Sequence, residues 1–227
     1  MAIIELDGVS VRAGGHDILR DIAFRLDERR VAIIGANGSG KSTLARLFNA
    51  LLLPSTGVVK VGGIDTRSDQ KHARRMVGMV FQNPEHQIVM PTVAEDIAFG
   101  PRNLGHPKPE TDAVISAVLA VYGMADKRDC PAHLLSGGEK KLLSILSVLV
   151  MEPQVIVFDE PLASLDHSNR RRILGLIDSL PQRVVTITHD LDTLEAYDRA
   201  LLLHEGWLVA DGAPADVRAR YLELIGE

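Results

Sequence analysis

The feature that most constrains the fold is the run Gly-Ala-Asn-Gly-Ser-Gly-Lys-Ser-Thr at residues 35–43. It fits the pattern G-x-x-x-x-G-K-[ST], a loop whose backbone N–H groups surround the phosphates of a nucleotide. Residues 31–34 form a short apolar run suited to a buried strand, and residues 43–52 have helical spacing. Strand, loop and helix in this order aim the positive end of the helix at the anion. This unit predicts an α/β protein that binds a nucleotide.

Each residue type in the loop suits a nucleoside triphosphate with Mg²⁺. Glycines let the chain curl with its amides pointing inward. Lys41 brings a mobile positive charge to the β- and γ-phosphates, and the Ser42 hydroxyl is a hard oxygen ligand for Mg²⁺. We therefore expect a nucleoside triphosphate and Mg²⁺ as cofactors. The candidate nucleotide-binding residues are Gly35, Asn37, Gly38, Ser39, Gly40, Lys41, Ser42 and Thr43.

The bulk composition excludes several classes of protein. A net charge of −5 argues against a chain whose main partner is nucleic acid, because such proteins usually carry a basic face. Cys130 is the only cysteine, so no internal disulfide can form and a reducing compartment is expected. The N-terminus lacks the pattern of a secretory signal. The longest apolar stretch, residues 142–151, is about half the length that spans a bilayer. Any membrane role is therefore expected to be peripheral, through a partner.

Apolar runs and helical spacing alternate along the chain, which predicts a parallel α/β sheet. The predicted strands lie at residues 3–11, 18–26, 58–61, 77–81, 155–158, 184–188 and 200–203, and the predicted helices at 110–122, 139–151, 168–180 and 215–225. The first three strands are expected to form an antiparallel flap beside the loop. We expect one domain, 1–227, with its core at 1–82 and 153–227, a helical insertion at about 83–135 and a helix at 136–152.

Two further motifs carry chemistry. Asp159 and Glu160 end a buried strand, and strand ends face the ligand crevice of an open α/β sheet. Asp159 is then placed to hold Mg²⁺ through water, and Glu160 to act as general base on an attacking water. In the run Leu135-Ser136-Gly137-Gly138-Glu139, Ser136 can cap the following helix while the glycines leave its N–H groups bare for an anion. Such a helix start makes sense if it closes on the nucleotide of another subunit.

With these motifs in this order, the chain resembles the ATPase subunits of ATP-binding-cassette (ABC) transporters over essentially its whole length. The matching residues are the loop 35–43, Gln82, the signature segment 135–139, Asp159 and Glu160, Ser164-Leu165-Asp166, and His189. The resemblance implies a phosphate-loop NTPase of the ABC ATPase type, with a mostly parallel sheet core, an antiparallel β-subdomain and a helical subdomain. It also implies a head-to-tail dimer of identical chains or of a chain and its paralogue.

In such a dimer, two ATP molecules are held between the phosphate loop of one subunit and the signature segment of the other. The resemblance therefore adds Ser136, Gly137, Gly138 and Glu139 of the opposing subunit to the nucleotide site. It implies that Gln82 senses Mg²⁺ and the attacking water, that His189 contacts the γ-phosphate, and that Asp166 helps to connect the two sites. The implied catalytic residues are Glu160, His189 and Gln82, and the implied metal ligands are Ser42, Gln82 and Asp159.

Residues 81–87 and 92–101 resemble the energy-coupling-factor group of these ATPases, which drives bacterial uptake of vitamins and of cobalt or nickel ions. The resemblance implies a membrane-embedded coupling subunit, a substrate-binding membrane subunit and a place at the cytoplasmic face of the inner membrane. Biotin is the first substrate expected, and cobalt or nickel the second. The alternative is a non-transport ABC ATPase that docks on a soluble assembly scaffold.

One departure from the family concerns the nucleotide base. The family often has an aromatic residue near position 13, whereas the turn here reads Val-Arg-Ala-Gly-Gly-His at residues 11–16. Ala13 cannot stack on adenine. Either Arg12 or His16 provides a weaker platform, or the recognition of the base is loose.

Overall fold

The computed structural model describes residues 2–226, whose contacts divide the chain into two compact units. The first holds the described residues up to Met79, with Gln154–Glu160 and the chain from Leu180 onward; the second holds Val80–Pro153 and Pro161–Ser179. The sequence grouped residues 161–179 with the core. In the structure, α6 (His167–Ser179) joins the second unit, because Asn169 lies against Gly138 and Arg172 donates to the carbonyl of Tyr122.

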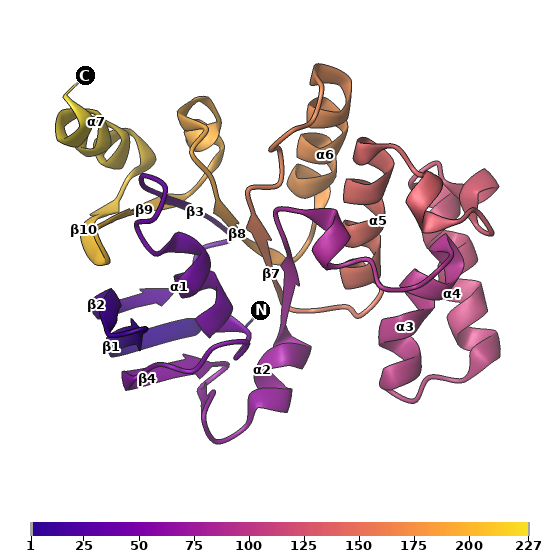
Figure 1. Ribbon diagram of the computed structural model, residues 1–227, viewed down its shortest axis with the longest axis horizontal. Helices are drawn as coiled ribbons and strands as arrows, with labels where there is room; N and C mark the ends of the chain where they lie inside the picture. Colours follow the sequence, from indigo (N-terminus) through magenta and orange to yellow (C-terminus); the bar gives the residue numbers. More distant parts are fainter. Residues whose placement is uncertain (1, 227) are drawn as a thin grey trace. The chain divides into compact units, whose positions relative to one another are not determined.

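The larger sheet of the first unit has the strand order β10-β9-β3-β8-β7-β6 (Figure 1). Its strands are β3 (Arg30–Ile34), β6 (Val77–Val80), β7 (Val155–Asp159), β8 (Arg183–Ile187), β9 (Arg199–His204) and β10 (Trp207–Gly212). β3 pairs in parallel with β8 and β9, β7 pairs in parallel with β8, and β10 closes the edge as an antiparallel hairpin. Nearly every residue of β3, β7 and β8 is buried, as expected for strands covered on both faces. The predicted α/β fold with a mostly parallel sheet is confirmed.

The smaller sheet is antiparallel, in the order β2-β1-β4-β5. Its strands are β1 (Ile4–Ala13), β2 (His16–Leu26), β4 (Thr56–Val61) and β5 (Ile64–Asp65). The β1–β2 register sets Ile4 opposite Leu26 and Leu6 opposite Phe24, all of them buried. Exposed polar residues alternate with these buried ones along each strand, which is typical of a sheet with one solvated face. The predicted antiparallel flap is therefore present, and β5 extends it.

The helices of the first unit are α1 (Lys41–Phe48), α2 (Gln70–Met76) and α7 (Pro214–Ile225), together with the 3₁₀ segment η4 (Leu191–Ala196). α1 ends four residues before the expected position 52, because Ala50 takes a left-handed conformation with φ of 54°. α7 packs Val217 against Ala32, Ile34 and Leu202 of the larger sheet. The sequence did not predict α2 and β10, which bury few apolar side chains and therefore give weak periodicity.

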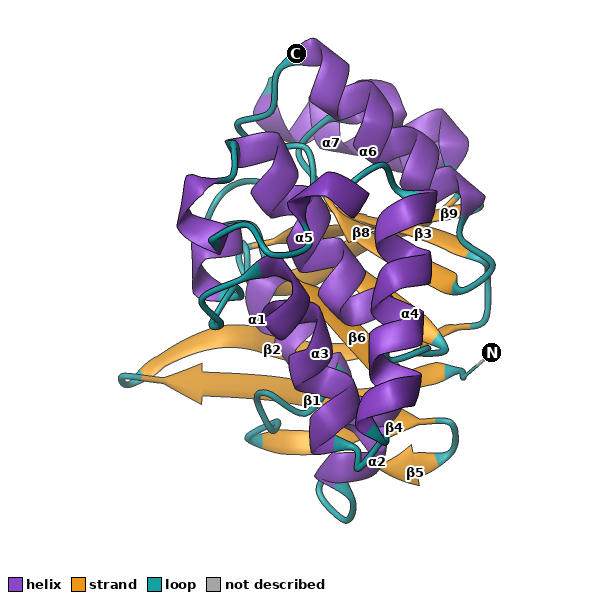
Figure 2. Cartoon of the chain, turned by 90° about the vertical axis from the view of Figure 1, so that its right-hand side faces the viewer, coloured by secondary structure: helices purple, strands orange, loops and turns teal. Residues whose placement is uncertain are grey.

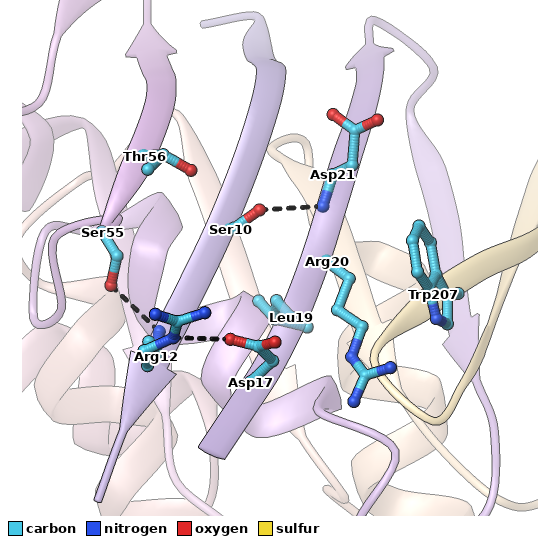
Figure 3. A pocket seen from close by; sticks show the side chains of 9 residues that line it. All are labelled: Ser10, Arg12, Asp17, Leu19, Arg20, Asp21, Ser55, Thr56 and Trp207. Carbon is cyan, nitrogen blue, oxygen red and sulfur yellow. Dashed lines mark hydrogen bonds and ion pairs between the residues drawn. The ribbon is translucent and has the colours of Figure 1, made fainter. Parts of the chain in front are cut away.

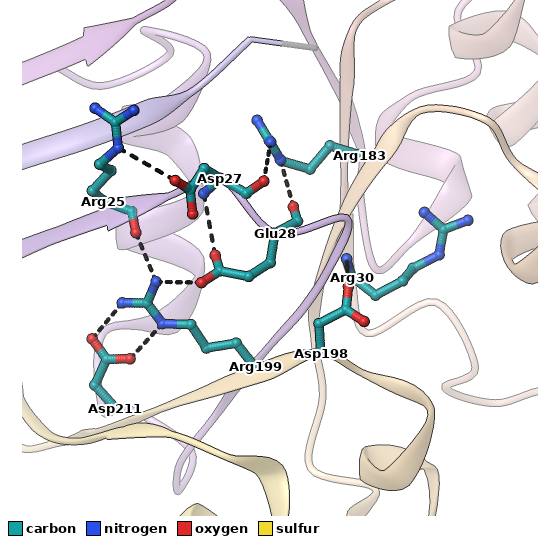
Figure 4. Close-up of polar contacts among 8 residues, drawn as sticks. All are labelled: Arg25, Asp27, Glu28, Arg30, Arg183, Asp198, Arg199 and Asp211. Carbon is teal, nitrogen blue, oxygen red and sulfur yellow. Dashed lines mark hydrogen bonds and ion pairs between the residues drawn. The ribbon is translucent and has the colours of Figure 1, made fainter.

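The amino ends of three neighbouring strands each begin with arginine: Arg30 in β3, Arg183 in β8 and Arg199 in β9 (Figure 4). Arg183 is 5% exposed and donates to the backbone carbonyls of Ala2, Asp27 and Glu28. Arg199 makes a bidentate pair with Asp211, at 2.6 and 2.7 Å, and a further bond of 2.8 Å to Glu28. We call this group of contacts the arginine edge; it joins the β2–β3 turn to the larger sheet.

The second unit is helical (Figure 2). Its helices are α3 (Val93–Asn103), α4 (Lys108–Val121), α5 (Gly137–Leu149) and α6, with 3₁₀ turns η1 (Pro84–His86), η2 (Ala125–Lys127) and η3 (Ala132–Leu134). α3 packs against both α4 and α5. A capping box starts α3: the Thr92 hydroxyl accepts from the Glu95 N–H, and the Glu95 carboxylate accepts from the Thr92 N–H.

Candidate functional site

Three adjacent parallel strands of the first unit bring candidate residues to one edge of the larger sheet. β3 leads into the phosphate loop, β8 leads to His189, and β7 ends at Asp159. Since the strands are parallel and β8 lies between β3 and β7, their carboxyl ends meet at the same edge (Figure 1). Topology alone therefore gathers residues that are more than 100 positions apart in the chain.

The phosphate loop has a backbone that side chains would obstruct. Gly40 has φ of +104°, and a Cβ there would lie 2.7 Å from Leu19 Cδ2 and 3.0 Å from the carbonyl oxygen of Ile18. Gly38 has φ of +81°, and no atom of the described chain lies within 4 Å of where its Cβ would be. Gly40 precedes α1 without a side-chain cap, so the N–H groups of the first turn keep their bonding capacity. A helix start of this kind binds anions.

Lys41 is held beside this loop although it is only 7% exposed. Its Nζ donates to the carbonyl oxygens of Gly35 at 2.7 Å and Ala36 at 2.8 Å. Burial lowers the pKa of Lys41, and the nearby carboxylates of Glu160 and Asp159 act in the opposite direction. A desolvated ammonium gains strongly from an anionic oxygen. The residue is therefore suited to phosphate.

Glu160 and His189 form a close pair. Glu160 Oε2 lies 2.8 Å from His189 Nδ1; the Glu160 side chain is 12% exposed and that of His189 is 65% exposed. The Glu160 backbone has φ of +47°, uncommon for a residue with a side chain, and its N–H donates to the Ile187 carbonyl oxygen at 3.0 Å. Such conformations cluster at functional sites, where the surrounding structure holds them. The carboxylate is thus fixed, while the imidazole remains open to a ligand.

Asp159 fits the role of a cation ligand. It is 6% exposed, and its Oδ1 is buried with no hydrogen-bond partner among residues 2–226. The described residues contain no group of three or more His, Cys, Asp or Glu side chains that could enclose a metal. A hard divalent cation at Asp159 would therefore take its other oxygens from the Ser42 hydroxyl, from the phosphates and from water, which is the usual manner of binding Mg²⁺.

The signature segment lies in the second unit, at the start of α5. The Ser136 hydroxyl accepts from the Glu139 N–H at 3.3 Å, and Glu139 Oε2 accepts from the Ser136 N–H at 2.8 Å, so that a complete capping box is formed. Bonds from the Ser136 N–H and hydroxyl lower the pKa of Glu139. Gly137 is exposed with open space around it, whereas a Cβ on Gly138 would collide with the Asn169 side chain. The expected cap is confirmed, and Gly137 is open to a ligand.

The second unit also holds Gln82, whose side chain is exposed. Its carbonyl oxygen accepts from Nζ of Lys141, a lysine that is 1% exposed within α5. Sequence reasoning missed Lys141. The available signal was a lysine directly before the apolar run 142–146, where a charge is unusual. The structure thus brings Lys41, Asp159, Glu160 and His189 together in one unit, and it holds Gln82 and residues 135–139 in the other.

A separate hollow lies on the smaller sheet, where Arg12 and His16 were the candidates for contact with the base. Arg12 Nε pairs with Asp17 Oδ1 at 2.7 Å and lines a pocket of about 430 Å³ (Figure 3). The opposite side of this pocket holds Trp207, with the Arg20 guanidinium 6.0 Å from its ring centre. The lining residues do not include the phosphate loop. Arg12 is therefore already engaged by a carboxylate, and the aromatic group in this neighbourhood is one that the sequence did not single out.

Within residues 2–226, no helix combines the length and the apolar character that a bilayer crossing requires.

The sequence matches a protein-family model described as ABC transporter over residues 19–163. A putative ABC transporter ATP-binding protein of Deinococcus radiodurans is 51% identical, over 97% of this chain and 98% of its own length. The biotin transport ATP-binding protein BioM of Rhodobacter capsulatus is 43% identical, over 98% and 95%. The energy-coupling factor transporter ATP-binding protein EcfA1 of Caldanaerobacter subterraneus is also 43% identical, over 88% and 75%.

Among solved structures, cbiO1 from Clostridium perfringens superposes with a TM-score of 0.82 at 30% identity. The alignment covers 97% of this chain and 94% of that one, and cbiO1 is described as part of the ABC transporter complex cbiONQ. The similarity therefore includes both compact units of the present structure.

Proposed function

Because this chain belongs to the ABC transporter family, as one of its ATPases, we propose that it is the motor subunit of an energy-coupling-factor importer and that the importer carries biotin. The biotin assignment is supported by the similarity to BioM over nearly the whole of both chains. The energy-coupling-factor type is supported by the similarity to EcfA1 and by residues 81–87 and 92–101. Cobalt or nickel is the second substrate class; cobalt is supported by the similarity to the cobalt import ATP-binding protein CbiO of Syntrophus aciditrophicus, 47% identical over 83% of this chain and 69% of its own length.

The observation that carries the hydrolytic part of the proposal is the contact between Glu160 and His189 at the sheet edge where the phosphate loop begins. Glu160 acts as general base and takes a proton from the water that attacks the γ-phosphorus, while the bond from the γ-phosphorus to the β–γ bridging oxygen breaks and ADP leaves. The exposed imidazole of His189 contacts the γ-phosphate, and Lys41 balances the charge that develops on its oxygens. Because Glu160 is fixed by its backbone bond to Ile187, it needs little rearrangement before the reaction.

Ser42, Asp159 and Gln82 would hold Mg²⁺, which would supply positive charge to balance that of the β- and γ-phosphates. The buried Oδ1 of Asp159, which has no hydrogen-bond partner within residues 2–226, supports this assignment.

Two anion-binding helix starts in one chain favour a working pair of chains. The phosphate loop receives the triphosphate of its own subunit, and Ser136, Gly137, Gly138 and Glu139 of the opposing subunit complete the site in a head-to-tail dimer. ATP draws the two chains together because each triphosphate is fully neutralised only when both half-sites meet. Hydrolysis and phosphate release then open the dimer, as in other switches that depend on a γ-phosphate. The partner chain is a second copy or a paralogue.

We propose that the opening and closing of the dimer drives a conformational change in a membrane partner. In this proposal the ATPase lies at the cytoplasmic face of the inner membrane as a peripheral subunit, and residues 82–100 receive the membrane-embedded coupling subunit. A separate membrane subunit binds the substrate. The exposed apolar side chains of Val89 and Phe99, 62% and 43% exposed, support a protein contact at this segment.

The test is purification of the intact complex from detergent-solubilised membranes, followed by reconstitution into vesicles that contain ATP and Mg²⁺. We expect polytopic partners and ATP-dependent accumulation of labelled biotin, with cobalt and nickel ions as the comparison substrates. Accumulation of cobalt or nickel ions without accumulation of biotin would contradict biotin as the substrate and support a metal ion in its place. A soluble scaffold protein as the only partner would contradict transport and favour the non-transport alternative.

A further inference from the structure

Three polar residues, Lys141, Ser144 and Ser147, lie three positions apart along α5. Residues three apart are neighbours on a helix surface, so the three positions form a continuous row. Lys141 and Ser147 are joined to residues 81–90 through their side chains, Ser147 by way of Asp96, whereas Ser144 takes part through its backbone carbonyl oxygen. We call this row the polar seam of α5.

The first tie of the seam is the buried cation Lys141. Its Nζ donates to the Phe81 carbonyl oxygen at 3.0 Å and to the Gln82 carbonyl oxygen at 2.7 Å. An ammonium that is 1% exposed is costly to bury, so its bonds must be well formed. Lys141 therefore fixes two consecutive peptide groups, the one that joins Phe81 to Gln82 and the one that follows Gln82.

The second tie is Gln87, whose side-chain amide oxygen and nitrogen bond to residues 81–90 and to α5, respectively. Its Oε1 accepts from the Phe81 N–H at 3.1 Å, and its Nε2 donates to the Ser144 carbonyl oxygen at 2.6 Å. Phe81 is thus held through its carbonyl by Lys141 and through its N–H by Gln87. The peptide groups on both sides of the Phe81 Cα are therefore bonded, one directly to α5 and the other to α5 through Gln87.

The third tie is Asp96 of α3, which is 4% exposed. Its Oδ1 accepts from the N–H groups of Val89 at 2.9 Å and Met90 at 3.2 Å, and its Oδ2 accepts from the Ser147 hydroxyl at 2.8 Å. The far end of the segment is therefore fastened to the same helix, one turn beyond Ser144. All of these contacts lie within the second unit.

We propose that the polar seam makes residues 81–90 and the signature helix one mechanical piece, in which Lys141 and Gln87 are positioning residues. Gln82 then moves only together with Ser136 and Gly137. A displacement of residues 81–90 by a membrane partner therefore displaces the start of α5 as well, because the segment does not deform. The inference rests on the proposed function only in assigning nucleotide roles to Gln82 and the signature segment.

A neighbouring lysine provides a matched control. Lys140 also reaches residues 81–90, through Glu85; the Lys140 side chain is 16% exposed and that of Glu85 is 59% exposed. An ion pair with one partner largely in solvent contributes little to stability. Lys140→Met removes a charge at the adjacent position without touching the seam.

The first experiment follows hydrogen exchange in the purified chain, with and without ATP and Mg²⁺. In the wild type and in Lys140→Met, peptides covering 81–90 and 137–149 should gain protection together at one ATP concentration. In Lys141→Met, residues 81–90 should exchange at least about tenfold faster and lose this common response, while the phosphate-loop peptide still responds to ATP. Lys141→Arg should restore the common response. If Lys141→Met does not fold, Gln87→Ala tests the same prediction.

The second experiment measures ATP hydrolysis by the intact complex. Lys141→Met should lower kcat at least about tenfold with KM for ATP changed less than about twofold, and Lys141→Arg should recover most of kcat. Wild-type exchange of residues 81–90 in Lys141→Met or in the folded Gln87→Ala variant would overturn the proposal. So would equal loss in Lys141→Met and Lys141→Arg with faster exchange throughout α5. A complex that hydrolyses ATP but transports nothing would contradict the proposed function, while the exchange result would still decide on the seam.

Discussion

The two ends of the same parallel strands have opposite characters. At the amino ends of β3, β8 and β9, Arg30, Arg183 and Arg199 donate to backbone carbonyls and carboxylates (Figure 4). At the carboxyl ends, Asp159 has a buried oxygen with no hydrogen-bond partner among the described residues, and Glu160 has a strained backbone. The arginines of the first edge are bonded to several groups each, whereas the second edge retains unused bonding capacity. This sheet therefore concentrates stability at one edge and reactivity at the other.

The largest expected effect is at the reactive edge. Glu160→Gln keeps the size of the side chain but removes the general base, so kcat should fall by about 10²–10⁴-fold. The free energy of unfolding should change by less than about 0.5 kcal/mol, because no bond of the arginine edge is involved. Steady-state ATP hydrolysis and urea denaturation measure the two quantities, and light scattering with ATP should show a trapped dimer. A normal rate of hydrolysis would refute the assignment of the base.

The next effect belongs to the stable edge. Arg183→Met leaves three backbone carbonyl groups without their donor, and it should lower the free energy of unfolding by about 2–4 kcal/mol. In the fraction that remains folded, kcat should match the wild type. The control is Arg218→Met on the exposed face of α7, which should be neutral. A loss of kcat without a loss of stability would show that Arg183 serves catalysis rather than stability, and would contradict the contrast between the two edges.

A third variant separates binding from chemistry. Lys41→Ala removes a charged donor for the phosphates and should weaken ATP binding by about 10–100-fold. Because burial lowers the pKa of Lys41, its charge costs the unliganded protein some free energy. The variant also removes the donor to the carbonyl oxygens of Gly35 and Ala36, and because the two effects oppose each other the unfolding midpoint should change little. Calorimetric titration with ATP checks the first point, and unchanged affinity would contradict the role of the loop.

The smallest effect is a pH dependence at the arginine edge. Burial pushes the pKa of Glu28 upward, but bonds from the backbone and from Arg199 outweigh it and lower the pKa. The folded pKa is thus below the unfolded value of about 4.3, so the contribution of Glu28 is complete above that value and is lost as pH falls through the folded pKa. Glu28→Gln should lower stability by less than about 1 kcal/mol at pH 7, with a difference that shrinks toward pH 3. If the difference in unfolding free energy between the wild type and Glu28→Gln grew as the pH fell, the pKa of Glu28 would be raised in the folded protein rather than lowered.

The sequence predicted the reactive edge better than the stable one. Lys41, Asp159 and Glu160 sit in motifs whose residue types follow from phosphate chemistry, and His189 was expected through the resemblance to the ABC ATPases. A parallel sheet brings these strand ends together whatever the details of packing. Arg183 and Arg199 have no motif, because their partners are carbonyl groups and carboxylates from distant turns. The polar seam escaped prediction for the same reason: a serine in a helix gives no sign that Asp96 or Gln87 will contact it.

Trp207 is the only tryptophan of the chain. It directly follows Gly206, whose N–H donates to the carbonyl oxygen of Ser39 in the phosphate loop and whose carbonyl oxygen accepts from the N–H of Arg20. The indole is 46% exposed, and the Arg20 guanidinium lies against its ring. Any movement of Ser39 that accompanies phosphate binding would therefore reach the indole through a single residue, Gly206. We expect ATP to change the intrinsic tryptophan fluorescence, which stopped-flow measurement can follow without any attached dye.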